Sequence, residues 1–238
     1  MDYVFVNPVA GAGKGKELAK QFSHAQIIET TGSDDEKKVQ EMLKNEPDKI
    51  IGIGGDGTVH LLAQHLVGKK IPLQIVPAGS TNSIYYELQK YRPTAIDVLS
   101  VNDVFAIHLA GFGLNARIIK QADNEDTGAW KYLKQLFSSI KNTKNAKFLI
   151  DGNEYTTPVL VLANGRAFRK TIRINPKGRY DDGKCELCTP GFQRQFSEIE
   201  IQNPDKEAFQ VDGEFMGHPE KVMAKCVPKA LLITYSDT

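Results

Sequence analysis

In residues 50–60, IIGIGGDGTVH, a short apolar run ends abruptly in glycine. The apolar run predicts a buried strand, and residues 58–66 predict a helix directly after it. Glycines between a strand and a helix permit positive φ angles and let a ligand approach backbone N–H groups closely. Taken alone, Gly54–Thr58 is typical both of a phosphate-binding loop and of an aspartate-glycine turn with Thr58 as helix cap.

The first ninety residues repeat this strand-to-helix pattern. Strands are expected at 3–7, 25–30, 49–54 and 72–77, and helices at 33–46, 58–66 and from 80 onward. Strands separated by helices form right-handed parallel units, so the pattern predicts a doubly wound, Rossmann-like α/β sheet. Ligands bind at the carboxyl edge of such sheets. Three glycine-containing loops fall at that edge: Asn7–Gly15, Gly54–Thr58 and Pro77–Asn82.

After residue 93 the sequence changes to short β-rich runs separated by turn residues. We therefore expect a nucleotide-binding α/β domain over 1–93 and a mostly antiparallel β-sandwich over 94–238. Asp151-Gly152-Asn153 predicts a hairpin turn. One helix is expected at 128–147, with an apolar stripe and several lysines. That pattern is typical of a core-facing helix, the favoured interpretation, or of an interfacial helix that contacts anionic lipid.

The composition excludes several classes of protein. The 238 residues carry a formal net charge of +1, which provides no overall field to attract nucleic acid. No apolar run reaches the roughly 20 residues that span a bilayer, so a cytoplasmic location is expected. Cys185 and Cys188 have CxxC spacing but lack the second ligand pair of a zinc site. Their offset of three places the thiols on opposite faces of a strand, so we interpret them, like Cys226, as ordinary buried cysteines.

An ordered set of motifs adds a family resemblance. NPVAG (7–11), GGDGT (54–58) and PAGSTN (77–82) are followed by GFGLNA (111–116), ANGRAF (163–168), NPKGRYDDGKCEL (175–187) and VDGEF (211–215). The set resembles the diacylglycerol kinase catalytic-domain family, which includes bacterial lipid kinases and sphingosine kinases, and it covers essentially the whole chain. The resemblance implies ATP-dependent phosphorylation of a hydroxyl of diacylglycerol or a related lipid. It also implies an active site in the cleft between the two domains.

The resemblance implies a role for individual residues. Glu214 of the DGE motif corresponds to the general base, and Asp56 is expected to act through Mg²⁺ or water. A structural Mg²⁺ would be bound by Asp182 and the backbone carbonyls of Arg179 and Lys184. The nucleotide would contact Asn7, Pro8, Val9, Ala10, Gly11, Thr30 (or Thr31), Gly54, Gly55, Asp56, Gly57, Thr58, Gly79, Ser80 and Asn82.

The implied partners are ATP, Mg²⁺ and a lipid or other small-molecule hydroxyl acceptor. Nucleic acid is not expected, and the sequence leaves the oligomeric state open. A membrane-bound acceptor would require transient peripheral contact at the inner face of the membrane.

Several positions depart from the family pattern. Leu61 stands where a glutamate is usual, Ser83 and Tyr86 where an acid and an arginine are common, Asn115 where an aspartate is frequent, and Ala12 where a lysine follows NPxxG. Loss of these charges would weaken transition-state stabilisation. A catalytically weak or inactive nucleotide-binding protein is therefore one alternative. An NAD kinase is a second, because it shares GGDG, although PAGSTN is more similar to the lipid-kinase loop.

Overall fold

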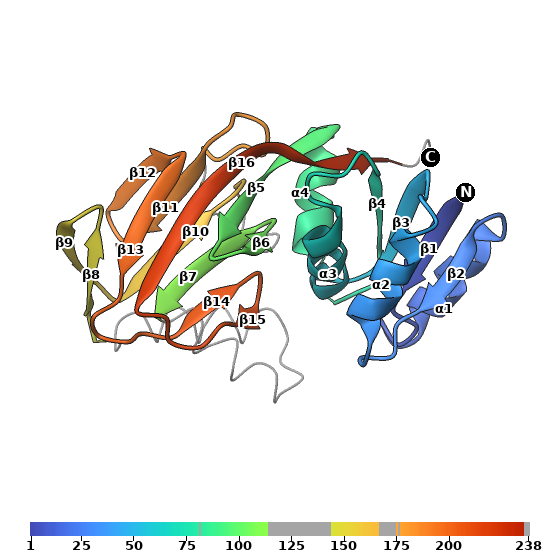
Figure 1. The fold of residues 1–238 in the computed structure, drawn as a ribbon, viewed down its shortest axis with the longest axis horizontal. Helices are drawn as coiled ribbons and strands as arrows, with labels where there is room; N and C mark the ends of the chain where they lie inside the picture. The colour runs from blue at the N-terminus through green and yellow to red at the C-terminus, as the bar shows by residue number, and fades with distance from the viewer. Residues whose placement is uncertain (81, 114–143, 167–174, 176, 236–238) are drawn as a thin grey trace.

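The computed structural model describes residues 1–80, 82–113, 144–166, 175 and 177–235. Its N-terminal part is a parallel sheet with the strand order β2-β1-β3-β4 (Figure 1). The strands are β1 (Asp2–Val6), β2 (Gln26–Glu29), β3 (Lys49–Gly54) and β4 (Leu73–Pro77). The predicted α/β architecture is therefore confirmed.

Helices cover both faces of this sheet, because successive residues of each strand point to opposite faces. On one face of the sheet, side chains of β1 and β3 form a core with residues of α2 (Asp35–Leu43), α3 (Asp56–Leu66) and α4 (Ser83–Tyr91). On the other face, α1 (Lys14–Ala19) and the 3₁₀ turn η1 (Lys20–Phe22) contribute to a smaller core. The sheet is doubly wound, as the sequence predicts.

The second half forms two antiparallel layers that enclose a single apolar core (Figure 1). One layer is a six-stranded sheet with the order β12-β11-β10-β7-β14-β15. The strands of the second half are β5 (Ala95–Val101), β6 (Val104–Ala106), β7 (Leu109–Gly113), β8 (Ala146–Ile150), β9 (Asn153–Thr157), β10 (Val159–Ala163), β11 (Cys185–Thr189), β12 (Phe192–Phe196), β13 (Glu198–Gln202), β14 (Phe209–Val211), β15 (Glu214–Phe215) and β16 (Lys221–Thr234). This arrangement confirms the β-sandwich.

Strand β16 joins the two halves. Its first part pairs antiparallel with β5 and β13 inside the sandwich, and its last residues pair parallel with β4, with Ile233 opposite Leu73. Figure 1 shows it as the red ribbon that crosses from the sandwich to the α/β part. The register shifts between Val227 and Leu231, where Lys229 has a φ of 49°. The parallel sheet and one layer of the sandwich are thus one continuous ten-stranded sheet.

The prediction of a helix at 128–147 is wrong at its C-terminal end. Ala146 and Lys147 belong to strand β8, where Ala146, Phe148 and Ile150 alternate in burial and face the sandwich core. Lys144 and Asn145, just before β8, are in neither a helix nor a strand, and residues 128–143 lie outside the described residues, as does Asn115. In the described part of the chain, no helix has the length and apolar character to cross a membrane.

The expected hairpin and the expected cysteine burial are both confirmed. Ile150 pairs with Asn153 across a two-residue turn in which Asp151 and Gly152 have φ angles of 49° and 80°. The thiols of Cys185 and Cys188 are free and lie in different apolar clusters on the two faces of β11, and Cys226 is also buried and free.

Candidate active site

Three glycine loops meet at the carboxyl edge of the parallel sheet. A Cβ atom on Gly79 would lie 2.5 Å from the Cα of Gly55, and one on Gly11 would lie 2.3 Å from the carbonyl oxygen of Ala78. No real Cβ fits at such distances, so glycine is required for the loops to pack against one another. Gly11 also has a φ of +59°, in the left-handed region. The convergence predicted from the sequence is therefore present.

The loops enclose a pocket of ≈ 1120 Å³. All the nucleotide-binding residues expected from the sequence line it, except Gly54 and Asn82. It is lined by Asn7, Pro8, Val9, Ala10, Gly11, Ala12, Thr30, Thr31, Gly32, Asp35, Gly55, Asp56, Gly57, Thr58, Leu61, Gly79 and Ser80. The first turn of α3 forms one wall, so the positive end of the helix dipole and its N–H groups favour an anion there.

Gly54 and Asn82 shape the loops from outside the pocket. A Cβ on Gly54 would lie 2.1 Å from Thr58 Oγ1, so the threonine side chain lies directly over this glycine. Asn82 accepts the N–H of Gly79 (3.0 Å) and donates to its carbonyl oxygen (2.7 Å). Helix α3 begins at Asp56 with Gly55 as its N-cap, so Thr58 is not the cap.

Asp56 connects the GGDGT loop to helix α4. Its two carboxylate oxygens accept the N–H groups of Ser83 (3.0 Å) and Ile84 (3.2 Å), which lie in the first turn of α4. Each oxygen retains a second lone pair, and Asp56 also lines the pocket. A carboxylate in this position repels phosphate directly but suits a hydrated Mg²⁺, so the residues fit the ion that the sequence implies.

The DGE turn is anchored by Asp212, a residue that the sequence analysis did not single out. Its side chain is 1% exposed and accepts the backbone N–H groups of Ile107 (2.7 Å), His108 (3.0 Å) and Leu109 (2.9 Å). The ring nitrogen Nδ1 of His60 lies 3.1 Å from Oδ2, and it must donate because a carboxylate only accepts.

Burial alone would raise the pKa of Asp212, but the other contacts reverse the direction. The hydrogen bond and charge of His60 and the N–H groups of Leu109 and Ile107 hold this pKa below its ordinary value. Asp212 has a φ of 46° and Gly213 a φ of 101°, which is a tight hairpin turn between β14 and β15. Glu214 follows at the start of β15 and is exposed to solvent. A buried anchor thus fixes an exposed carboxylate.

Residues His60 and Gln64 were also missed, although the sequence carries a signal for them. Asp56, His60 and Gln64 follow one another at intervals of four along α3, which places polar groups on adjoining parts of one helix face. Gln64 donates to the carbonyl oxygen of Phe105 (2.6 Å) and accepts its N–H (2.9 Å). This face of α3 is therefore hydrogen-bonded to the second half of the chain.

A buried neutral pair lies beside these contacts. The Nδ1 atom of His108 is 3.0 Å from the hydroxyl of Tyr180. Burial lowers the pKa of His108, and burial together with the charge of Glu87 raises that of Tyr180, so both side chains are uncharged near neutral pH. Their hydrogen bond lies within the second half of the chain, and the Tyr180 side chain also packs in the core that includes Ile84 and Leu88 of α4.

The second ion site stays a prediction. Asp182 is exposed and accepts the N–H of Lys184 (3.1 Å), and the guanidinium of Arg179 pairs with Asp181 (2.9 Å) rather than with Asp182. Among the residues that the structure describes, no three His, Cys, Asp or Glu side chains cluster as metal ligands. An ion here would depend on backbone carbonyls, as the resemblance implies.

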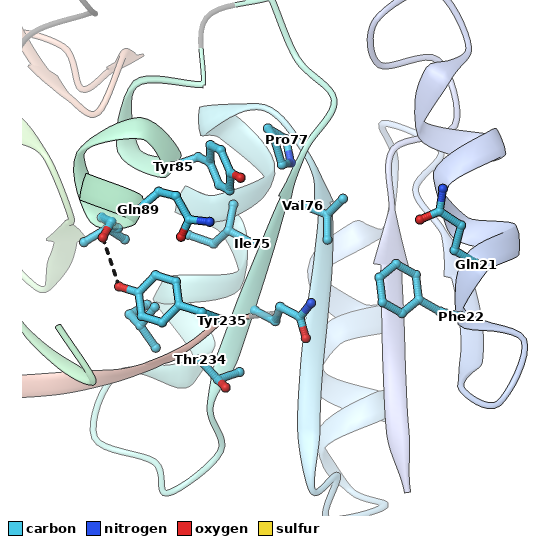
Figure 2. A pocket seen from close by; sticks show the side chains of 12 residues that line it. Gln21, Phe22, Ile75, Val76, Pro77, Tyr85, Gln89, Thr234 and Tyr235 are labelled. Carbon is cyan, nitrogen blue, oxygen red and sulfur yellow. Dashed lines mark hydrogen bonds between the residues drawn. The ribbon is translucent and has the colours of Figure 1, made fainter. Parts of the chain in front are cut away.

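A smaller pocket of ≈ 210 Å³ lies at β4 and the end of β16 (Figure 2). Its walls include Phe22, Tyr85 and Tyr235, and the hydroxyl of Tyr235 donates to the carbonyl oxygens of Leu88 (3.2 Å) and Pro93 (3.0 Å). Among the described residues that line it, none is charged and none is shared with the larger pocket. The larger pocket is therefore the candidate for a phosphate-bearing ligand.

Comparison with solved structures identifies the fold. A crystal structure of a Bacillus anthracis diacylglycerol kinase aligns with 99% of this chain and 97% of its own, at a TM-score of 0.75 and 20% identity. An Archaeoglobus fulgidus NAD kinase in complex with ATP aligns less closely, at a TM-score of 0.52 and 14% identity, over 98% of this chain and 93% of that one. The fold is the one that diacylglycerol kinases and NAD kinases share.

Sequence comparison finds the same similarity. Residues 2–110 match the family model of the diacylglycerol kinase catalytic domain. A Pectobacterium atrosepticum protein named "Probable lipid kinase YegS-like" is 26% identical over 76% of this chain and 76% of its own length. A Synechocystis protein is 23% identical over 97% of this chain and 69% of its own. The resemblance to lipid kinases is therefore confirmed.

Substituting Gly79 with alanine should separate the loops and weaken nucleotide binding at least tenfold. The new Cβ would overlap the backbone of Gly55, and backbone cannot rotate away as a flexible side chain does. Calorimetric titration with Mg·ATP measures the loss. Gly57→Ala is the companion variant, because its Cβ would meet nothing within 4 Å and the fold should tolerate it. Unchanged affinity in Gly79→Ala would show that the two loops do not hold the nucleotide together.

Proposed function

We propose that this protein transfers the γ-phosphoryl group of ATP to a hydroxyl of diacylglycerol or a related lipid. The observation that carries the proposal is the meeting of three glycine loops at one pocket, with the N-terminus of α3 in its wall. The match of residues 2–110 to the diacylglycerol kinase catalytic domain supports the same conclusion. Each of these features suits polyphosphate, which binds backbone N–H groups at strand and helix ends.

Glu214 is the proposed general base. A lipid hydroxyl must lose its proton as it attacks phosphorus, and a carboxylate fixed in position can accept that proton. The rigid anchor of Asp212 beneath the turn supports this role because it fixes the backbone two residues before Glu214. Asp56 is the proposed residue for Mg²⁺, which would neutralise charge on the phosphates when bound.

Incubation with γ-labelled ATP and Mg²⁺ tests the proposal. Separate reactions would contain micelles of diacylglycerol, a sphingoid base or phosphatidylglycerol, and one would contain NAD in place of lipid. Label in a lipid supports the proposed reaction and identifies the acceptor. Label in NAD would instead support an NAD kinase. If no acceptor is labelled while ATP still raises the melting temperature, the protein is a nucleotide-binding protein without this activity.

A nucleotide-binding protein without kinase activity is the second candidate function. The position of Leu61 favours it. Leu61 lines the phosphate pocket, so an apolar side chain occupies a wall where typical members have a carboxylate. We expect Leu61→Glu to raise Mg²⁺-dependent turnover about tenfold, since a second acid would help to hold the ion. Leu61→Gln, which has the same size without the charge, is the matched control. Equal turnover in both variants would show that the missing charge does not limit the reaction.

A further inference from the structure

Helix α3 contacts both the phosphate pocket and the DGE turn (Asp212–Glu214). Its first turn, Asp56–Thr58, lies in the wall of the phosphate pocket. One turn further along, His60 donates to the buried carboxylate of Asp212, and its own side chain is only 11% exposed. The helix therefore connects the GGDGT loop directly to the DGE turn.

A second connection runs beside the first. Gln64 forms two hydrogen bonds with the backbone of Phe105 in β6, one as donor and one as acceptor. The residues that follow β6, from Ile107 to Leu109, donate their N–H groups to Asp212. Segment 105–109 is thus held between α3 on one side and Asp212 on the other.

The two connections converge on the backbone that carries Glu214. Asp212 donates its own N–H to the carbonyl oxygen of Leu109 (2.8 Å), and Gly213 donates to Gln210 Oε1 (2.8 Å). These contacts join α3 to the turn both through His60 and through segment 105–109. Buried hydrogen bonds of this kind transmit displacement because breaking one leaves an unsatisfied polar group.

We propose that His60 and Gln64 are positioning residues that couple nucleotide binding at the Gly54–Thr58 loop to the position of the DGE turn. The inference rests on the proposed function for its catalytic consequence, since Glu214 is the residue that would be positioned. The coupling itself is a property of the contacts and has its own readout. By thermodynamic reciprocity, a turn held by α3 also favours the nucleotide-bound arrangement of the loop.

Hydrogen–deuterium exchange tests the coupling without turnover. The wild-type protein is compared with and without the β,γ-imido analogue of ATP and Mg²⁺. Exchange should slow in the peptide containing 54–58 and also in the peptides containing 105–109 and 211–215. In the double variant His60→Leu/Gln64→Leu, the nucleotide should still protect 54–58 but should no longer protect the other two segments.

Single variants keep the test valid if the double variant does not fold. His60→Gln retains a donor for Asp212 and should preserve the coupling, whereas His60→Leu should weaken it. In the kinase assay the double variant should lose about tenfold in kcat with little change in KM for ATP, because the base rather than the nucleotide is misplaced. A merely structural role would lower stability without this division between kcat and KM.

Two results would overturn the coupling. One is nucleotide-dependent protection of 105–109 and 211–215 that persists in a folded double variant. The other is a wild-type protein in which the nucleotide protects 54–58 and leaves both distant segments unchanged. If the wild type shows the expected protection but phosphorylates no acceptor, the proposed lipid kinase reaction fails and the coupling stands. If the nucleotide fails to protect 54–58, both are contradicted.

Discussion

Glu214→Gln should abolish phosphoryl transfer while leaving nucleotide binding almost unchanged. Glutamine has the size of glutamate but cannot accept a proton, and loss of a general base costs about 10²–10⁴-fold in rate. Glu214 lies on an exposed two-residue strand and outside the residues that line the phosphate pocket, so the change should not disturb that pocket. Turnover of labelled ATP and the nucleotide-induced rise in melting temperature are measured on the same preparation.

Glu220→Gln is the matched control for this prediction. Its carboxylate is 83% exposed and pairs with Lys206 at 3.7 Å, so its loss should alter neither measurement. If Glu214→Gln retains full turnover, another group accepts the proton. If it loses nucleotide binding instead, Glu214 has a structural role, and the assignment of the base is wrong.

Asp212→Asn should destabilise the protein by about 3–5 kcal/mol, the range measured when one partner of a buried ionic contact is removed. The carboxylate accepts three backbone N–H groups and His60, and an amide replaces one acceptor oxygen with a donor. Urea unfolding monitored by circular dichroism measures the change. Asp205→Asn is the control, because the exposed Asp205 accepts one N–H, from Lys147, and should cost about 1 kcal/mol or less.

The loss of stability caused by Asp212→Asn, measured against the wild type, should depend on pH. Because folding lowers the pKa of Asp212, its contribution to stability is fully present above the unfolded pKa of about 3.9. That contribution is lost as the pH falls through the lower folded value. The difference in unfolding free energy between wild type and Asp212→Asn should therefore be smaller below about pH 4 than at neutral pH. A difference that grows on acidification would contradict a lowered pKa.

The parts of the fold that depend on local patterns could be predicted from the sequence. The run IIGIG before GGDG identifies β3 and the loop after it, and the positions of the other strands follow from the same alternation. Contacts between distant residues could not be predicted in this way. Strand β16 pairs with β4, so that Ile233 lies opposite Leu73, which is 160 positions earlier in the sequence. No local pattern specifies that pairing.

In the candidate site too, local motifs could be predicted from the sequence, whereas contacts between distant residues could not. The glycine loops are contiguous motifs and were predicted, and the structure brings them to one pocket. The sequence identifies Asp212 only as part of the motif before Glu214, because its role depends on backbone groups about a hundred residues away. The helix at 128–147 failed at its end for another reason: Ala146, Phe148 and Ile150 alternate with period two, but the lysine-rich stretch before them suggested a helix.

The proposed reaction transfers a phosphoryl group from ATP bound in this pocket to a lipid hydroxyl. The most direct measurement is mass spectrometry of a total membrane lipid extract after incubation with the protein, ATP and Mg²⁺, with ATP carrying ¹⁸O in its γ-phosphoryl group. We expect a lipid that has gained one ¹⁸O-labelled phosphoryl group, absent when Glu214→Gln replaces the wild type. If the extract remains unchanged although the wild-type protein binds ATP, the protein is not a lipid kinase.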